Sequence, residues 1–133
     1  MGDCLKPNFF IAARPSANRL VILSLAQVEF RSALRRRERS GEIPSVVANQ
    51  LLDLFKRQAE NRFVTQAVTD FLIDLASALV DRHRLRAFDA IQLAGYLALK
   101  SSVGAETPIF VCAEHGLLST AKLEGVPVLD PCV

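Results

Sequence analysis

Short apolar runs alternate along this chain with longer segments in which apolar residues recur at helical spacing. The apolar runs predict strands at residues 19–24, 62–65, 108–112 and 126–129. The periodic segments predict helices at residues 25–39, 44–60, 69–80, 88–100 and 115–124. Strands that alternate with helices favour parallel pairing. We therefore expect a three-layer α/β fold in which helices flank a short, mainly parallel sheet.

Residues at the ends of these segments support the assignment. Ser24 and Thr69 carry hydroxyl groups that can accept a hydrogen bond from the first free amides of a helix. Gly41 and Gly125 follow two of the predicted helices, and glycine commonly ends a helix. Residues 1–18 show no period and contain two prolines, so we expect an irregular N-terminal segment. A chain of 133 residues has room for one domain, spanning residues 1–133.

Composition and charge narrow the functional classes. The net charge is only +2, so binding to nucleic acid would need a local basic patch. Cys4, Cys112 and Cys132 are far apart and lack zinc-ribbon spacing, which fits a reducing cytoplasm. The chain shows no signal-peptide pattern and no apolar stretch of membrane-spanning length. We expect a soluble cytoplasmic protein that does not associate with membranes.

Two acidic residues lie where a helix should bury apolar side chains. Glu29 falls within the apolar arc of the first helix, between Leu25, Ala26 and Ala33. Asp89 begins a helix that is apolar nearly all round, where an unpaired charge is costly. Each acid also has a structural interpretation, since carboxylates favour the positive end of a helix dipole. Both interpretations stay open at this point.

Glu114 is a third candidate, because it directly follows one predicted strand and precedes a helix. A helix-capping role is the simpler interpretation of this residue alone. Ligands of open α/β sheets bind at the carboxyl ends of the strands, where Glu29, Asp89 and Glu114 could converge. Carboxylate oxygens suit Mg²⁺ or Mn²⁺, which activate water and stabilise charge on a reacting phosphate. We therefore take these three acids as candidate metal-binding and catalytic residues.

The segments around these acids resemble motifs of the PIN-domain family. The resemblance lies in residues 24–34, 86–94 and 110–118, and the ending at residues 124–131 is also similar. The middle segment, which contains Asp89, is the most specific of them. The chain resembles PIN domains of the toxin type, and the resemblance implies a Mg²⁺- or Mn²⁺-dependent endoribonuclease. It also implies an RNA substrate, a homodimer and a small antitoxin protein that neutralises the nuclease.

Two departures from the family pattern reduce the expected activity. The family's first motif is an aspartate that closes an N-terminal strand, and this strand unit is missing from the predicted elements. Asp3 is the only acid before Glu29, and it follows no apolar run. The family usually has aspartate at the position of Glu114. We therefore expect weak or absent cleavage, and we keep a second hypothesis: a non-catalytic PIN-fold remnant that dimerises or binds an antitoxin-like partner.

Basic residues and histidines give weaker signals. Residues 35–37 and Arg39 end the first predicted helix, where cations complement the helix dipole. A solvated helix end is the simpler interpretation of these arginines, and an RNA-contacting patch is the alternative. His115 neighbours Glu114 and could assist proton transfer, although a surface histidine is the simpler interpretation.

Overall fold

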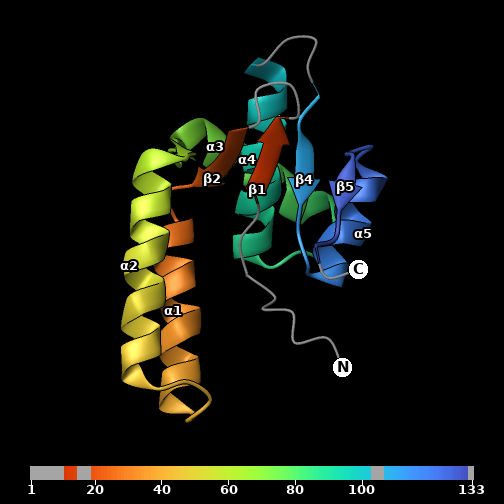
Figure 1. The fold of residues 1–133 in the computed structure, drawn as a ribbon. Coiled ribbons are helices and arrows are strands. Elements are labelled where there is room, and N and C mark those ends of the chain that lie inside the picture. The colour runs from red at the N-terminus through yellow and green to blue at the C-terminus, as the bar shows by residue number, and fades with distance from the viewer. Residues whose placement is uncertain (1–10, 15–18, 103–106, 132–133) are drawn as a thin grey trace.

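The computed structural model describes residues 11–14, 19–102 and 107–131 (Figure 1). In these ranges the strands are β1 (Ile11–Arg14), β2 (Arg19–Leu23), β3 (Phe63–Gln66), β4 (Ile109–Val111) and β5 (Val128–Leu129). The helices are α1 (Ala26–Arg39), α2 (Ser45–Asn61), α3 (Asp70–Arg82), α4 (Ala87–Ser102) and α5 (His115–Leu123). All of the predicted helices and strands are present, and their ends agree to about two residues. The mixed α/β class is confirmed.

The strands form one five-stranded sheet in the order β3-β2-β1-β4-β5. β2 pairs with β3 in parallel, and β4 pairs with β5 in parallel. β1 lies between these two pairs and is antiparallel to both β2 and β4. Four strands therefore run in one direction, and their carboxyl ends lie at one edge of the sheet. We call this edge the carboxyl edge.

β1 corrects two expectations from the sequence. The irregular segment predicted for residues 1–18 is wrong at Ile11–Arg14, and the rest of that segment lies outside the described residues. The sheet is also mixed, because two of its four pairings are antiparallel. β1 is short and gives little strand signal of its own. It pairs because β2 and β4 both offer backbone groups that need partners: Ile11 lies opposite Ile22 on one side and Val111 on the other.

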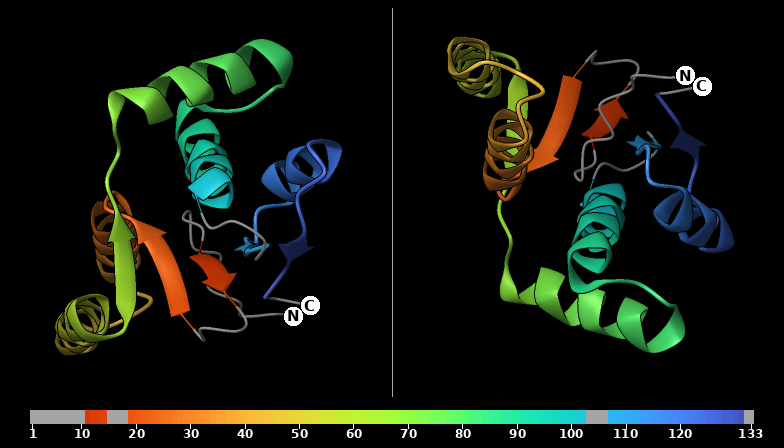
Figure 2. Two further views of the ribbon diagram at one scale, coloured as in Figure 1. Left: turned by 90° about the horizontal axis from the view of Figure 1, so that it is seen from above. Right: turned by 90° about the horizontal axis from the view of Figure 1, so that it is seen from below.

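The helices divide into two groups around the sheet. Figure 2 shows α3, α4 and α5 on one side of it, whereas Figure 1 shows α1 and α2 side by side, projecting beyond the β2–β3 edge. Val21 and Leu23 pack into the main core with α3 and α4. Ile22, which points the other way, packs on Ala26 and Ala59 at the base of α1 and α2. Because side chains alternate between the two faces of β2, this strand contacts both groups of helices.

Helix ends follow the predictions at most positions. The Thr69 hydroxyl accepts a hydrogen bond from the Leu72 amide at 3.2 Å, which confirms the predicted cap of α3. Gly41 and Gly125 have φ of 82° and 75°, left-handed values that glycine adopts without strain. The predicted Ser24 cap is wrong, because α1 begins after Leu25 and has no side-chain cap. The Ser24 amide instead donates to the Gln66 carbonyl at 2.8 Å and extends the pairing of β2 with β3.

α4 is the most buried helix of the described chain. Residues Ala90, Leu93, Ala94 and Tyr96 have no exposed surface. The Tyr96 ring packs edge-on against the Phe110 ring of β4, with centroids 5.7 Å apart. None of the helices in the described ranges is long and apolar enough to cross a membrane.

The hydrogen bond of Tyr96 gives a direct test of this packing. Its hydroxyl donates to the Pro108 carbonyl at 2.6 Å, and both residues are buried. Tyr96→Phe should lower the free energy of unfolding by about 1–2 kcal/mol, because the carbonyl loses its donor without gaining water. Urea denaturation measures this change. Ser101→Ala, which removes an exposed hydroxyl bonded to Ala98, is the control and should change stability by less than about 0.5 kcal/mol. An unchanged midpoint for Tyr96→Phe would contradict the packing described.

Candidate functional site at the carboxyl edge

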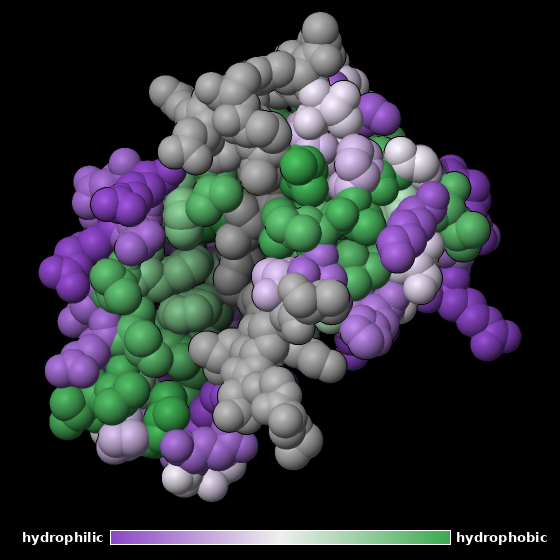
Figure 3. All heavy atoms as spheres, turned by 45° about the vertical axis from the view of Figure 1, so that its right-hand side comes forward, coloured by the Kyte–Doolittle hydropathy of each residue, from purple (hydrophilic) through white to green (hydrophobic). Residues whose placement is uncertain are grey.

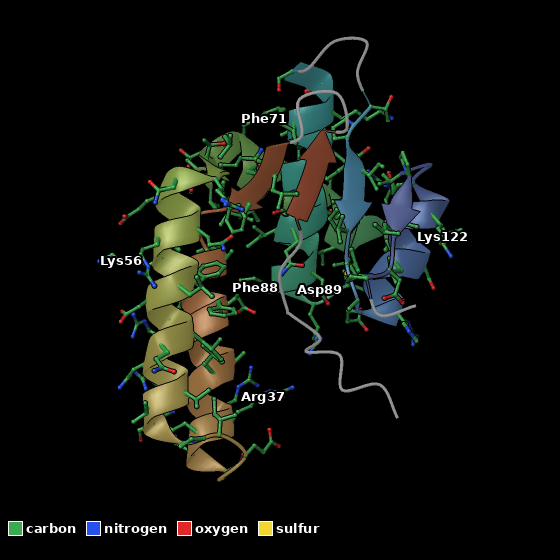
Figure 4. All side chains as sticks on the ribbon, viewed as in Figure 1. Arg37, Lys56, Phe71, Phe88, Asp89 and Lys122 are labelled. Atoms are coloured by element: carbon green, nitrogen blue, oxygen red, sulfur yellow. The ribbon has the colours of Figure 1, made fainter. Side chains whose placement is uncertain are left out.

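Each of the three candidate acids lies at the start of a helix near the carboxyl edge. Glu29 is in the first turn of α1, and Asp89 is in the first turn of α4. Glu114 is the N-cap residue of α5, directly after β4. Figure 4 shows Asp89 and Phe88 at the lower end of α4, between the ribbons of α1 and α5. The fold therefore brings the starts of these three helices, and the acids that they carry, to the same edge of the sheet.

Glu29 and Asp89 line the same open cavity, which has a volume of about 370 Å³. We call it the α1–α4 cavity. Its other lining residues are Ser32 and Arg36 from α1, with Arg86 and Phe88 at the start of α4. Glu29, Ser32 and Arg36 are three or four residues apart, so they lie on one face of α1. Two acids from separate parts of the chain thus face one space.

The charges in and near the cavity change the pKa values of its two acids. Burial raises the pKa of Asp89, and the negative charge of Glu114 raises it further, while Arg86 opposes the shift. Burial also raises the pKa of Glu29; Arg36 opposes this, and the charge of Asp89 adds to it. Carboxylates with raised pKa values are poorly solvated and gain from a nearby cation. Asp89 is the more buried, with 12% of its side chain exposed.

Arg86 supplies the nearest positive charge to Asp89. Its Nε lies 3.5 Å from Asp89 Oδ2, and the two residues are three positions apart. The Arg86 side chain is 78% exposed, so this pair lies at the mouth of the cavity. The contact reduces the cost of burying the Asp89 charge.

Glu114 caps α5 with both of its carboxylate oxygens. Its Oε1 accepts from the Gly116 amide at 3.1 Å, and its Oε2 accepts from the Leu117 amide at 2.6 Å. A side chain at position 116 would approach within 3.2 Å of Glu114 Oε2, so glycine there leaves room for this cap. Glu114 does not line the α1–α4 cavity. It influences Asp89 through its charge, and its capping interpretation is confirmed.

The end of β4 carries additional negative charge. Burial raises the pKa of the Cys112 thiol to about 11, and the charges of Glu114, Asp89 and Asp130 contribute to the increase. Three carboxylates therefore lie within electrostatic range of this sulfur. Cys112 is buried, as expected for a packing cysteine, while Cys4 and Cys132 lie outside the described residues.

Three residues of this region were not among the predicted site residues. Asp130 directly follows β5, and its Oδ2 lies 3.8 Å from His115 Nε2. The rule that selected Glu114, an acid just after a strand, would also have selected Asp130. Arg36 was considered only as part of the basic end of the first helix, and Arg86 was not selected because no strand precedes it. The sequence did contain a signal for each. Arg36 is seven residues after Glu29 and Arg86 is three residues before Asp89, and both spacings place the two side chains on the same face of a helix.

The donor set fits a metal ion only in part. Carboxylate oxygens of Glu29 and Asp89 are suitable ligands for Mg²⁺ or Mn²⁺, which retain several water ligands. Within residues 11–14, 19–102 and 107–131, however, no three His, Cys, Asp or Glu side chains are grouped closely enough to hold a metal ion. Asp3 lies outside these ranges.

Comparisons with known proteins leave the family resemblance as a prediction. No family model matches the chain, and neither the curated proteins nor the solved structures include a significant match.

The raised pKa of Asp89 predicts a stability effect that depends on pH. A buried carboxylate with a raised pKa destabilises the fold when it is ionised, and this cost disappears at strongly acidic pH, where it is protonated in both folded and unfolded states. Asp89→Asn should therefore raise the melting temperature at pH 7 in the presence of a chelator, and the gain should shrink as the pH falls. Thermal unfolding at a series of pH values measures this.

Asp53→Asn, at an exposed position of α2, is the matched control and should leave the melting temperature nearly unchanged. Loss of stability in Asp89→Asn at pH 7 would mean that the carboxylate is primarily a structural cap of α4.

Proposed function

We propose that this protein is a metal-dependent endoribonuclease of the PIN type, with low activity. The observation that carries the proposal is the shared cavity of Glu29 and Asp89, two carboxylates from different helices whose pKa values are raised by burial. These residues would hold Mg²⁺ or Mn²⁺, which when bound supplies activated water and stabilises charge on a phosphate. An RNA substrate and a small antitoxin partner follow from the family resemblance.

Two features support the low activity. β1, the strand in the centre of the sheet, has the sequence Ile-Ala-Ala-Arg and contributes no acid. It also runs opposite to its neighbours, so its carboxyl end lies away from the carboxyl edge. Glu114, the third candidate ligand, uses both oxygens to cap α5. Two carboxylates hold a hard cation less firmly than three or four, because ligand number and negative charge set the affinity.

Cleavage of a single-stranded RNA in the presence of Mn²⁺ tests the proposal. We expect slow cleavage by the protein, abolished by a chelator and by Asp89→Asn. Glu29→Gln should reduce it at least about tenfold, because the same ion loses a ligand. Asp53→Asn should cleave as the wild type does. Cleavage that survives Asp89→Asn would place the active site elsewhere, and no cleavage by any preparation would favour the second function.

The second candidate function is a non-catalytic one, in which the chain dimerises or binds an antitoxin-like partner. Its support is exposed apolar surface. A cavity of about 300 Å³ between α3 and α4 is lined mainly by apolar side chains, among them Ile73, Val80 and Ile91. Ile73 and Val80 are each 43% exposed. Figure 3 shows further apolar side chains over α1 and α2 and toward the β4–β5 edge. Such surface commonly marks a protein interface.

Sedimentation velocity tests self-association through α3. We expect a dimer at about tens of micromolar, the range of a moderately weak complex. Val80→Lys should shift the protein to monomer, because a lysine in an apolar interface leaves a buried charge without a partner. Val46→Lys makes the same change at a 65% exposed position of α2 and should remain dimeric. A wild-type monomer at this concentration would contradict the prediction.

A further inference from the structure

The cavity between α3 and α4 is an apolar hollow that is open to solvent. We call it the α3–α4 cavity; its volume is about 300 Å³, and its largest lining side chains are Ile73, Val80 and Ile91. Ile73 and Val80 remain 43% exposed, although each has apolar neighbours in the lining. A hollow of this size can accept a large apolar side chain from a partner.

α3 lies where such a partner can reach it. Figure 2 shows α3 at the edge of the molecule, on the side of α4 that faces away from the sheet. Leu72 and Leu79 bury the inner face of α3 in the main core. The lining residues of the α3–α4 cavity all belong to α3 and α4, so no other described element contributes to its walls. The outer face of α3 is therefore available for binding.

Acidic side chains follow one edge of the cavity. Asp70, Asp74, Ser77 and Asp81 are three or four residues apart along α3, so they lie in one stripe. Ser77 and Asp81 line the α3–α4 cavity, which places this stripe at its rim. We call the three aspartates the α3 acidic stripe. All three are exposed, and among the described residues none has a cationic group within 4.0 Å.

The stability of α3 does not explain the whole stripe. Asp70 is in the first turn, where the helix dipole favours an acid, but Asp81 is in the last turn, where the dipole disfavours one. Arg82, the basic residue of that turn, contacts Glu124 beyond α5 at 3.4 Å instead. The negative charge beside the cavity therefore lacks a counter-charge within the described fold.

We infer that the α3–α4 cavity and the α3 acidic stripe bind an amphipathic helix of another protein. The partner helix inserts a large apolar side chain into the cavity and places lysine or arginine along the stripe. Helices recognised in grooves use apolar anchors one or two turns apart. Asp74 and Asp81 are about 10 Å apart along α3, which matches two turns of a partner helix. The inference deepens the second candidate function and does not depend on the nuclease proposal.

The charges favour a basic helix over a second copy of this chain. A two-fold contact through α3 uses the same surface of both copies, so it brings two acidic stripes into one interface. Like charges facing each other oppose such a contact. Self-association through α3 should therefore be weak, and a basic helix should displace the second copy.

The first experiment measures binding of a labelled helical peptide to the full chain by fluorescence anisotropy. The peptide has about 18 residues, enough to form a helix, with leucines in one stripe and lysines beside them. A matched peptide has glutamate in place of every lysine. We expect the lysine peptide to bind at least about tenfold more tightly, because several charge pairs change sign together. Equal binding, or tighter binding of the glutamate peptide, would overturn the inference.

The second experiment tests the acidic stripe with a substitution that should not harm the helix. Asp81→Lys places a cation in the last turn of α3, where the dipole favours it. It should weaken binding of the lysine peptide about three- to tenfold and strengthen binding of the glutamate peptide. Asp53→Lys makes the same charge change at an exposed position of α2 and should leave the ratio of the two affinities as in wild type. The same ratio in Asp81→Lys as in wild type would contradict the role of the stripe.

The third experiment tests the cavity. Ile73→Ala removes apolar surface from its wall and should weaken the lysine peptide about three- to tenfold. Leu54→Ala, at a 46% exposed position of α2, is the matched control and should bind as wild type does. Thermal unfolding checks that both variants are folded. Wild-type affinity in folded Ile73→Ala would mean that the anchor does not enter the α3–α4 cavity, and the inference would be wrong.

The outcomes separate this inference from both candidate functions. If the lysine peptide binds as expected and no RNA is cleaved, the inference stands and the nuclease proposal is wrong. If neither peptide binds but wild type forms a dimer that Val80→Lys disrupts, a second copy occupies the cavity. The inference would then be wrong, while the second candidate function would stand through dimerisation.

Discussion

The burial of the Asp89 carboxylate is the constraint on which the site depends. α4 packs against the sheet through residues that have no exposed surface. Asp89 lies one position before the first of them, Ala90, and 12% of its side chain is exposed. A charge at that depth needs a nearby cation, since water reaches it poorly. Arg86 supplies one at 3.5 Å. The pair is incomplete, however, because the pKa of Asp89 stays above its ordinary value. The carboxylate therefore favours any further positive charge in the α1–α4 cavity.

The direction of the strands decides which acids can reach that cavity. β2, β3, β4 and β5 all run the same way, so the segments that follow them begin at the carboxyl edge. Glu29, Glu114 and Asp130 arrive there for this reason. β1 fills the centre of the sheet in the opposite direction and brings no acid. β1 thereby completes the hydrogen bonding of the sheet. A central strand parallel to its neighbours would have ended at the carboxyl edge, where it could have added a carboxylate to the site.

Local patterns predicted most of the fold, and long-range pairing accounts for what they missed. Helical periodicity located all the helices, and the Thr69 cap was correct because capping depends on neighbours three residues away. β1 was missed because its pairing depends on β2 and β4, which are distant in sequence. Ser24 was misassigned as a cap for the same reason, since its amide pairs with Gln66 of β3.

The candidate site was predicted in part. Glu29 and Asp89 were selected because a charge on an apolar helix face is visible in the sequence, and both line the α1–α4 cavity. The role of Glu114 was left open by the sequence, because a cap and a metal ligand both require an acid just after a strand. Arg86 was not selected, and Arg36 was not distinguished from its neighbours, because exposed cations look alike in a sequence. Arg36 lines the α1–α4 cavity, whereas Arg35 contacts Glu38 and Arg37 lies near Glu42.

The central claim is that Glu29 and Asp89 bind the same divalent cation. A double-mutant cycle on Mn²⁺ affinity tests this claim most directly. The cycle compares wild type with Glu29→Gln, Asp89→Asn and the double variant by calorimetry at neutral pH. If both carboxylates bind one ion, each single variant should lose most of the affinity, and the double variant should lose little more than the worse single one. Losses that add independently, or Mn²⁺ binding that neither substitution changes, would contradict a common site.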